Sequence, residues 1–287
     1  MQSVPIRKAV IPAAGLGTRL LPATKELPKE MLPIFAYDEN ERRCMKPLLQ
    51  CVFEQLYDSG IREFCFIIGR GKRAIEDHFT QDHEYLETLK ERNRSEVDLE
   101  RFYERLSRST IIWINQPEPR GFGDAILKSQ ITIGNETFLV NAGDSLIISR
   151  NGSHLSRLAK IHRDLQAHAT FIVHEIENPT QYGVIDIEEK QGDVYKVRLA
   201  VEKPELPPSN LAIIPAYLFH PIIFDALSQL KPGKGGEIQL TDAIQKLIDW
   251  GKSVYAIKLE ADEIRLDVGT PETYWEALKL SFQNRSG

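Results

Sequence analysis

The sequence predicts an α/β protein with a mixed, mostly parallel central sheet and helices on both faces. Short apolar runs of strand length alternate with segments of helical periodicity, beginning with residues 8–14, 47–59 and 63–69. A strand–helix–strand unit of about 60 residues implies parallel strands joined by a right-handed crossover. The composition, 42% apolar and 27% charged over 287 residues, is that of a globular chain and excludes fibrous, disulfide-rich and wholly disordered proteins.

The elements follow in order from these patterns. Residues 8–14 form an apolar block that ends in a glycine-containing loop, which is typical of a buried strand. Residues 47–59 place apolar side chains at helical spacing, and Gly60 follows as a C-cap. Residues 75–108 are charged and predict an exposed helical hairpin. Further strands are expected at 111–115, 137–142, 170–175, 183–187, 195–201, 210–219 and 254–259, and helices at 121–130 in part, 242–250 and 271–282.

Charge and cysteine content limit the partners and the compartment. The chain has 36 Lys and Arg against 41 Asp and Glu, a net charge of −5, so no general basic field is available for nucleic acid. The three cysteines form no C-x-x-C pair, which suggests a reducing compartment. No stretch has the length of a signal peptide or a membrane span. We expect a soluble cytoplasmic protein that binds neither nucleic acid nor membrane.

The loop after the first strand is the strongest functional signal. Its sequence Ala-Ala-Gly-Leu-Gly-Thr-Arg at 13–19 lets backbone N–H groups approach a phosphate or a base. It is not a dinucleotide fingerprint, because Leu20 stands where the third glycine belongs, and no G-K-[ST] follows as in a P-loop. Basic side chains that could meet an anion follow at Arg19, Lys25 and Lys29, with Lys25 equally suited to a plain surface charge.

A resemblance to a known family rests on these residues. Residues 11–34 resemble the signature of the sugar-1-phosphate nucleotidylyltransferases, G-x-G-[ST]-R-L-x-P-x-T followed by K-x-x-x-P-K-x-M-L-P. The Pro-Lys-Glu-Met-Leu-Pro version at 28–33 is similar to the branch that acts on UTP and glucose 1-phosphate. Further short motifs recur in order over nearly the whole chain, among them 182–184, 201–204 and 236–243.

The resemblance implies a fold and a reaction. The expected fold is one Rossmann-like nucleotidyltransferase domain over 1–287, with a nucleotide-binding half at about 1–140 and a sugar-phosphate-binding half with a C-terminal helix at 141–287. The reaction would transfer the uridylyl group of UTP to glucose 1-phosphate, giving UDP-glucose and pyrophosphate by direct displacement assisted by Mg²⁺. A thymidylyltransferase, another sugar-1-phosphate nucleotidylyltransferase and a catalytically silent relative that binds nucleotide sugars are the alternatives. Relatives commonly assemble as homodimers or homotetramers.

The resemblance also assigns roles residue by residue. Arg19, Lys29 and Asp144 are the catalytic candidates, and Asp144 and Asp267 the candidate ligands of Mg²⁺, for which carboxylate oxygen is the preferred donor. Either carboxylate could instead serve only at a helix start. The nucleotide-binding candidates are Ala14, Gly15, Gln116 and Gly121, with closure of a turn as the alternative role of Gln116. The sugar-phosphate candidates are Gly183, Glu202 and Lys203.

Three departures from the uridylyl pattern bear on specificity and assembly. Asp124 stands where that branch often has His, which affects the expected base pocket. Residues 36–45 insert a polar stretch that we expect to form a surface loop. Residues 267–272 are closer to the thymidylyl relatives, so UTP and dTTP both remain open as substrates. The seven histidines show no ligand spacing and are expected to be surface or core residues.

Overall fold

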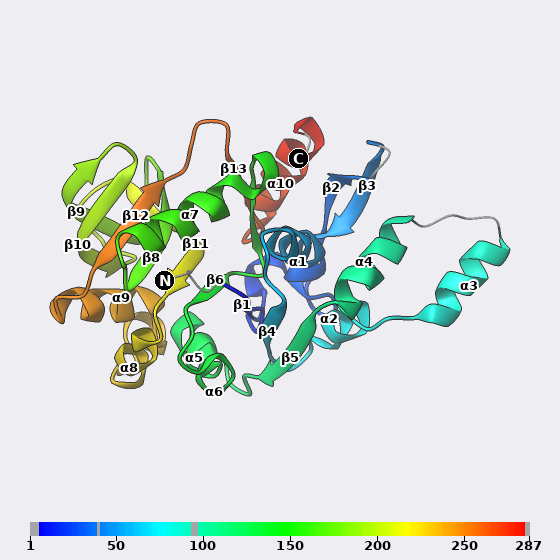
Figure 1. The fold of residues 1–287 in the computed structure, drawn as a ribbon, viewed down its shortest axis with the longest axis horizontal. Helices are drawn as coiled ribbons and strands as arrows, with labels where there is room; N and C mark the ends of the chain where they lie inside the picture. Colours follow the sequence, from blue (N-terminus) through cyan, green and yellow to red (C-terminus); the bar gives the residue numbers. More distant parts are fainter. Residues whose placement is uncertain (1–5, 39–40, 93–96, 285–287) are drawn as a thin grey trace.

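The structure is a computed structural model that describes residues 6–38, 41–92 and 97–284 (Figure 1). The strands are β1 (Lys8–Pro12), β2 (Pro33–Tyr37), β3 (Arg43–Pro47), β4 (Glu63–Ile68), β5 (Thr110–Asn115), β6 (Phe138–Asn141), β7 (Ser145–Ile148), β8 (Ala169–Glu175), β9 (Gly183–Gln191), β10 (Val194–Glu202), β11 (Leu211–Phe219), β12 (Val254–Lys258) and β13 (Ile264–Asp267). The α-helices are α1 (Leu48–Asp58), α2 (Arg73–His78), α3 (His83–Glu91), α4 (Val97–Ser107), α5 (Phe122–Leu127), α6 (Gln130–Ile133), α7 (Ser153–Asp164), α8 (Ile222–Ser228), α9 (Leu240–Asp249) and α10 (Pro271–Gln283). Short 3₁₀ segments are η1 (Thr18–Leu20), η2 (Lys29–Met31), η3 (Arg150–Gly152) and η4 (Lys234–Gly236).

One large mixed sheet organises the molecule. Across the described ranges it has nine strands in the order β5-β4-β1-β6-β11-β8-β12-β10-β9. The first half pairs in parallel, β1 with β4 and β6, and β4 with β5. Antiparallel pairs enter in the second half, where β11 lies against β6 and β8, and β10 against β12 and β9. The predicted mixed sheet, parallel in its first half with later antiparallel strands, is confirmed.

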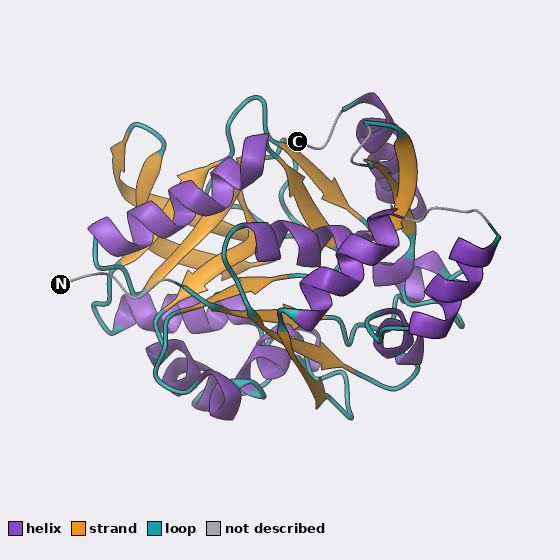
Figure 2. Ribbon diagram, turned by 45° about the vertical axis from the view of Figure 1, so that its right-hand side comes forward, coloured by secondary structure: helices purple, strands orange, loops and turns teal. Residues whose placement is uncertain are grey.

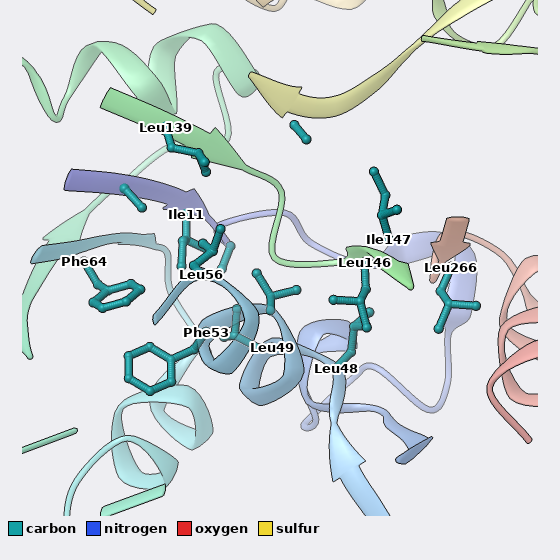
Figure 3. Packing of buried hydrophobic residues seen from close by; sticks show 14 of the residues in the cluster. Ile11, Leu48, Leu49, Phe53, Leu56, Phe64, Leu139, Leu146, Ile147 and Leu266 are labelled. Atoms are coloured by element: carbon teal, nitrogen blue, oxygen red, sulfur yellow. The ribbon is translucent and has the colours of Figure 1, made fainter. Parts of the chain in front are cut away.

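Both faces of the sheet are buried, as continuous apolar strands require. Ile11 and Phe64 pack on one face with α1, whereas their neighbours Val10 and Cys65 pack on the other face with α5, α8 and α9. Figure 2 shows helices on both sides of the strands. Figure 3 shows α1 against the first face, where the rings of Phe53 and Phe64 have centroids 4.5 Å apart. The period-two alternation along each strand therefore builds two cores.

The expectation of a surface loop at 36–45 is wrong. Pro33 to Tyr37 pairs with Arg43 to Pro47 in an antiparallel hairpin, β2–β3, and residues 39–40 lie outside the described part. Contacts with the distant α10 support it: Phe35 meets Phe282 with ring centroids 5.1 Å apart, and the Arg43 guanidinium lies 3.8 Å from the centroid of the same ring. Partners from the far end of the chain thus stabilise a hairpin whose polar residues favour a loop.

Several further elements escaped the sequence analysis, among them the helices α7 and α8 and the strands β7 and β13. The helix α7 carries mostly polar residues but buries Leu155 and Leu158 against the sheet. The short strands β7 and β13 pair with each other in antiparallel fashion, with Asp267 opposite Ser145. This small pairing brings a segment near the end of the chain to the loop that follows β6. None of the described helices is both long and apolar enough to cross a membrane.

Candidate active site

The glycine-containing turn begins where β1 ends. Gly17 has φ +65°, a left-handed conformation that glycine adopts readily, and the Thr24 hydroxyl donates to its carbonyl oxygen at 2.8 Å. The turn leads into η1, which carries Arg19. At Gly15 a Cβ atom would lie 3.8 Å from Cε of Lys29. The turn therefore presents Arg19 and stands close to Lys29, as the sequence predicted.

Lys29 and Asp144 form the central ion pair of the site. The ammonium group of Lys29, at the start of η2, bonds to Oδ2 of Asp144, which follows β6. Burial alone would lower the pKa of Lys29, but the carboxylates of Asp144, Glu30 and Asp267 outweigh it and the pKa is raised. The Lys29 side chain is therefore a cation held on the carboxyl side of the sheet.

A cavity of about 460 Å³ brings the predicted nucleotide-binding and catalytic residues together. It lies over the carboxyl ends of parallel strands, the usual ligand position in such sheets. Its lining includes the seven predicted residues Ala14, Gly15, Arg19, Lys29, Gln116, Gly121 and Asp144. By contrast, Lys25 is 77% exposed, pairs with Glu26 at 3.5 Å and does not line the cavity. Of the two roles left open for Lys25, the structure favours a surface charge.

A buried ion pair beside Lys29 was missed. Glu30 also lines the cavity, and its Oε2 lies 2.8 Å from Nζ of Lys72, with side-chain exposures of 2% and 7%. Burial raises the pKa of Glu30 despite the nearby lysines. Lys72 lies just after β4, the strand next to β1. A polar residue that follows a central parallel strand is a candidate for the site, and this position in the sequence could have indicated Lys72.

Gln116 lies at the end of β5 and serves both the turn and the cavity. Its amide Nε2 donates to the carbonyl of Gly121 at 3.2 Å and to Oδ2 of Asp124 at 2.7 Å. Gly69, at the end of β4, separates it from the glycine turn: a Cβ there would lie 3.3 Å from the carbonyl oxygen of Ala14 and 3.4 Å from that of Gln116. Gln116 thus closes the 116–121 turn while lining the cavity.

Close packing against residues 237 and 238 of the same chain requires a glycine at position 121. It has φ +107°, and a Cβ atom there would lie 2.6 Å from the carbonyl oxygen of Ile238 and 2.8 Å from Cβ of Glu237. The backbones are tied together, since the N–H of Ile238 donates to Arg120 at 2.8 Å and that of Gly123 to Ile238 at 2.9 Å. Packing alone therefore explains this glycine, and it places Glu237 in the cavity wall.

The predicted sugar-phosphate residues form a second cluster, outside the lining of this cavity. Glu202 accepts a hydrogen bond from the Thr241 hydroxyl at 2.6 Å and lies 3.3 Å from Nζ of Lys203. At Gly183 a Cβ would lie 2.6 Å from Oγ1 of Thr241 and 3.2 Å from Oε2 of Glu202. The three predicted residues are together, and Thr241, which the sequence analysis left without a role, joins them.

Asp267 reaches the site through the β7–β13 pairing. The N–H of Val268 donates to the carbonyl oxygen of Asp144 at 3.0 Å, so the two acidic segments are hydrogen-bonded. Oδ1 of Asp267 accepts from Arg265 at 2.9 Å. The helix-start role belongs to Thr270, whose hydroxyl accepts from the N–H of Thr273 in a capping box. Asp267 is thus not the cap of α10.

Arg265 was also missed, and it connects the two parts of the site. Its guanidinium holds Asp267 and lies 5.1 Å from the ring centroid of Tyr182, the residue before Gly183. On the other side, a Cβ at Gly269 would lie 3.0 Å from Oδ2 of Asp267 and 3.9 Å from Arg19. The cation therefore stands between the carboxylates and the sugar-phosphate cluster.

The donor set fits a hard divalent cation that is bound together with phosphates. No group of three or more His, Cys, Asp or Glu side chains suited to a metal occurs within the described residues. Asp144 and Asp267 both raise the pKa of Lys29, so both carboxylates lie near the same ammonium group. Mg²⁺ is commonly held by one or two carboxylates, with substrate phosphates and water completing the shell. These two residues could hold it in that way.

The histidines and the buried cysteine stay outside this chemistry. None of the seven histidines, all within the described ranges, lines the cavity. His154 lies 2.6 Å from the Ser149 hydroxyl, and burial lowers its pKa to about 3; His162 lies 3.0 Å from the Thr170 hydroxyl. Burial raises the pKa of the Cys65 thiol to about 12. His154, His162 and Cys65 are buried, so of the two settings expected for the histidines, surface or core, His154 and His162 occupy the core.

Comparison with known proteins finds relatives that cover nearly the whole chain. The profile of the Nucleotidyl transferase family matches residues 8–283. A UTP–glucose-1-phosphate uridylyltransferase of Pseudomonas aeruginosa is 38% identical over 97% of each chain, and one of Staphylococcus haemolyticus is 41% identical over 92% of this chain and 88% of its own. A crystal structure of a UDP-glucose pyrophosphorylase complexed with UDP-glucose superposes with a TM-score of 0.83 at 35% identity, covering 98% of this chain and 100% of that one.

Proposed function

The chain belongs to the nucleotidyl transferase family, and on that basis we propose that it transfers the uridylyl group of UTP to glucose 1-phosphate, giving UDP-glucose and pyrophosphate. One observation in the molecule carries the proposal: the Lys29–Asp144 pair lines the same cavity as the glycine turn, Arg19 and Gln116. Named relatives with this activity and coverage of nearly the whole chain support it.

The chemistry required of the residues is mainly neutralisation and positioning. A phosphate oxygen of glucose 1-phosphate attacks the α-phosphorus of UTP; the new O–P bond forms as the bond to the bridging oxygen of the β-phosphate breaks, and pyrophosphate leaves with that electron pair. Two anions must approach each other, so fixed cations lower the barrier. Lys29, kept protonated by its carboxylate neighbours, and Arg19 would meet the triphosphate.

The two halves of the chain would divide the substrates. In residues 1–140, Ala14, Gly15, Gln116 and Gly121 would hold the nucleotide. In residues 141–287, the Gly183, Glu202 and Lys203 cluster would hold the sugar phosphate, with Glu202 accepting from sugar hydroxyls. The Thr241 hydroxyl donates to the Glu202 carboxylate, which supports a role for Glu202 as an acceptor fixed in one position.

Mg²⁺ is the cofactor that we propose. Asp144 and Asp267 would hold it, and when bound it would supply further neutralisation of the phosphate charge. Asp267 is already oriented by Arg265 and Asp144 by Lys29, so both carboxylates are preorganised. Assembly as a homodimer or homotetramer stays a prediction.

Pyrophosphate release with UTP, dTTP, CTP and GTP against several sugar 1-phosphates, with and without Mg²⁺, tests the proposal. The expected optimum is UTP with glucose 1-phosphate, and release should require the metal. An optimum with dTTP would replace the uridylyl assignment by a thymidylyl one. No release with any pair would leave the silent, nucleotide-sugar-binding alternative.

A further inference from the structure

The side-chain amide of Gln116 can face its neighbours in only one way. Its two hydrogen-bond partners are Oδ2 of Asp124 and the carbonyl oxygen of Gly121. A carboxylate and a carbonyl are both acceptors, so only the NH₂ end of the amide can point at them. Both amide hydrogens are thereby used, and the oxygen Oε1 is the end left for a ligand.

Asp124 is the charged acceptor that, together with the Gly121 carbonyl, imposes this orientation. It is 7% exposed, lies behind Gln116 and is not part of the cavity lining, whereas Gln116 is. The ammonium group of Lys128 lies 3.8 Å from the same Oδ2, so the carboxylate also has a cation as a partner. Turning the amide over would place its oxygen 2.7 Å from a carboxylate oxygen, which is repulsive.

The outward-facing oxygen of the Gln116 amide affects which nucleotide base the cavity can accept. Gln116, which follows β5, lines the same cavity as Ala14 and Gly15, which follow β1, and β4 lies between these two strands. An acceptor fixed there matches the N3–H of the uracil or thymine imide. It opposes N3 of cytosine, which is itself an acceptor. A site built to receive a particular hydrogen discriminates strongly against a ligand that lacks it, because the buried acceptor is left unpaired.

We propose that Asp124 is a positioning residue for base selection, because it locks the Gln116 amide with its oxygen toward the nucleotide. The inference rests on the proposed function and adds a residue that does not itself meet substrate. It also gives a role to a position at which this chain departs from the uridylyl branch.

The test compares the Asp124→Asn variant with wild type. Asparagine keeps the shape but offers an NH₂ group, so Gln116 can turn over. We expect KM for UTP to rise about tenfold and the ratio of kcat/KM for UTP over CTP to fall at least tenfold, with KM for glucose 1-phosphate unchanged. Lys128→Met is the control; it removes the other partner of the carboxylate and should keep the wild-type ratio.

A double-mutant cycle separates positioning from general damage. In a Gln116→Met background, adding Asp124→Asn should change the UTP to CTP ratio no further, since the amide is gone. A folded Asp124→Asn protein with the wild-type ratio would overturn the proposal, as would equal losses with UTP and CTP. If the thermal melt shows that this variant is unfolded, Asp124→Ser, which also lacks the carboxylate, takes its place.

Binding without turnover separates this inference from the proposed function. Calorimetric titration of wild type and Asp124→Asn with UMP and CMP needs no sugar phosphate and no catalysis. Preference of the wild type for UMP, reduced at least tenfold in the variant, supports the role of Asp124 even if pyrophosphate release fails. Equal preference in the two proteins contradicts it even if the enzyme is active.

Discussion

Glu30 and Lys72 form an ion pair in the interior, Oε2 to Nζ 2.8 Å, immediately beside the lysine that bonds to Asp144. The pair connects η2 with the segment between β4 and α2. A Cβ at Gly143 would lie 3.3 Å from Cγ of Glu30, so the chain before Asp144 also rests on this side chain. The position of Lys29 thus depends on a buried pair one residue away.

Replacing Lys72 with methionine should destabilise the protein severely. The change leaves the Glu30 carboxylate buried without its cation, which typically costs about 3–5 kcal/mol in free energy of unfolding. Urea denaturation measures it. Lys90→Met is the matched control, because Lys90 pairs with Glu100 at 2.8 Å on the surface, and its midpoint should match wild type. A Lys72→Met midpoint equal to wild type would contradict the stabilising role of the pair.

The pH dependence of that variant has a definite sign. Burial already raises the pKa of Glu30 and Lys72 opposes the rise, so removing Lys72 raises the pKa further. A carboxyl whose folded-state pKa is raised binds its proton more tightly in the folded state, so stability falls as pH rises from the unfolded pKa through the folded one. The loss caused by Lys72→Met should therefore shrink in acid and grow toward neutral pH. Denaturation series at pH 5 and about pH 8 check this; an equal loss at both contradicts it.

Lys29→Met should lower the rate of pyrophosphate release at least 100-fold, because a fixed cation facing the phosphates is lost. Lys25→Met is the control and should remain within about twofold of wild type, since Lys25 is in solvent outside the cavity. Steady-state kinetics with UTP and glucose 1-phosphate measure both. Equal rates for the two variants would remove Lys29 from the machinery.

Asp144→Asn should leave the fold intact and abolish turnover. The amide keeps the size of the carboxylate but loses the charge that faces Lys29 and, in the proposed mechanism, the metal. Thermal melting and pyrophosphate release over a range of Mg²⁺ concentrations measure the two effects. Wild-type turnover together with a normal melt would refute the metal role.

Gly121→Ala should destabilise the protein through a backbone clash. The new Cβ would lie 2.6 Å from the Ile238 carbonyl oxygen at φ +107°. Gly134→Ala is matched in having positive φ, +63°, but nothing within 4 Å, so it isolates the conformational cost, about 1–3 kcal/mol for an unfavourable backbone region. Melting temperatures should fall much further for Gly121→Ala. Equal shifts would mean that the clash is relieved by movement.

Thr241→Val should raise KM for glucose 1-phosphate about tenfold and leave KM for UTP unchanged, because Glu202 loses the donor that fixes its carboxylate. Thr88→Val, on the distant helix α3, controls for loss of a hydroxyl. Initial rates with each substrate varied in turn give both constants. A rise confined to KM for UTP would place Glu202 outside the sugar-phosphate cluster.

Most strands of the large sheet and several amphipathic helices were predictable because their signal lies within each segment. The run before Gly15 and the helix that buries Phe53 were found from local pattern alone. The hairpin β2–β3 was not, since its support comes from Phe282. For the same reason motif residues were located but their partners were not: Lys72 is 42 positions from Glu30, and no periodicity encodes that contact.

The pairing of β7 with β13 also sets the order in which the site can be completed during synthesis. A ribosome releases the glycine turn, Lys29 and Asp144 well before it adds Asp267. Until β13 has emerged and paired with β7, Asp144 lacks the Asp267 carboxylate. A nascent chain stalled before residue 264 could therefore form the parallel half of the sheet, yet its candidate active site would lack Asp267 until β13 was made.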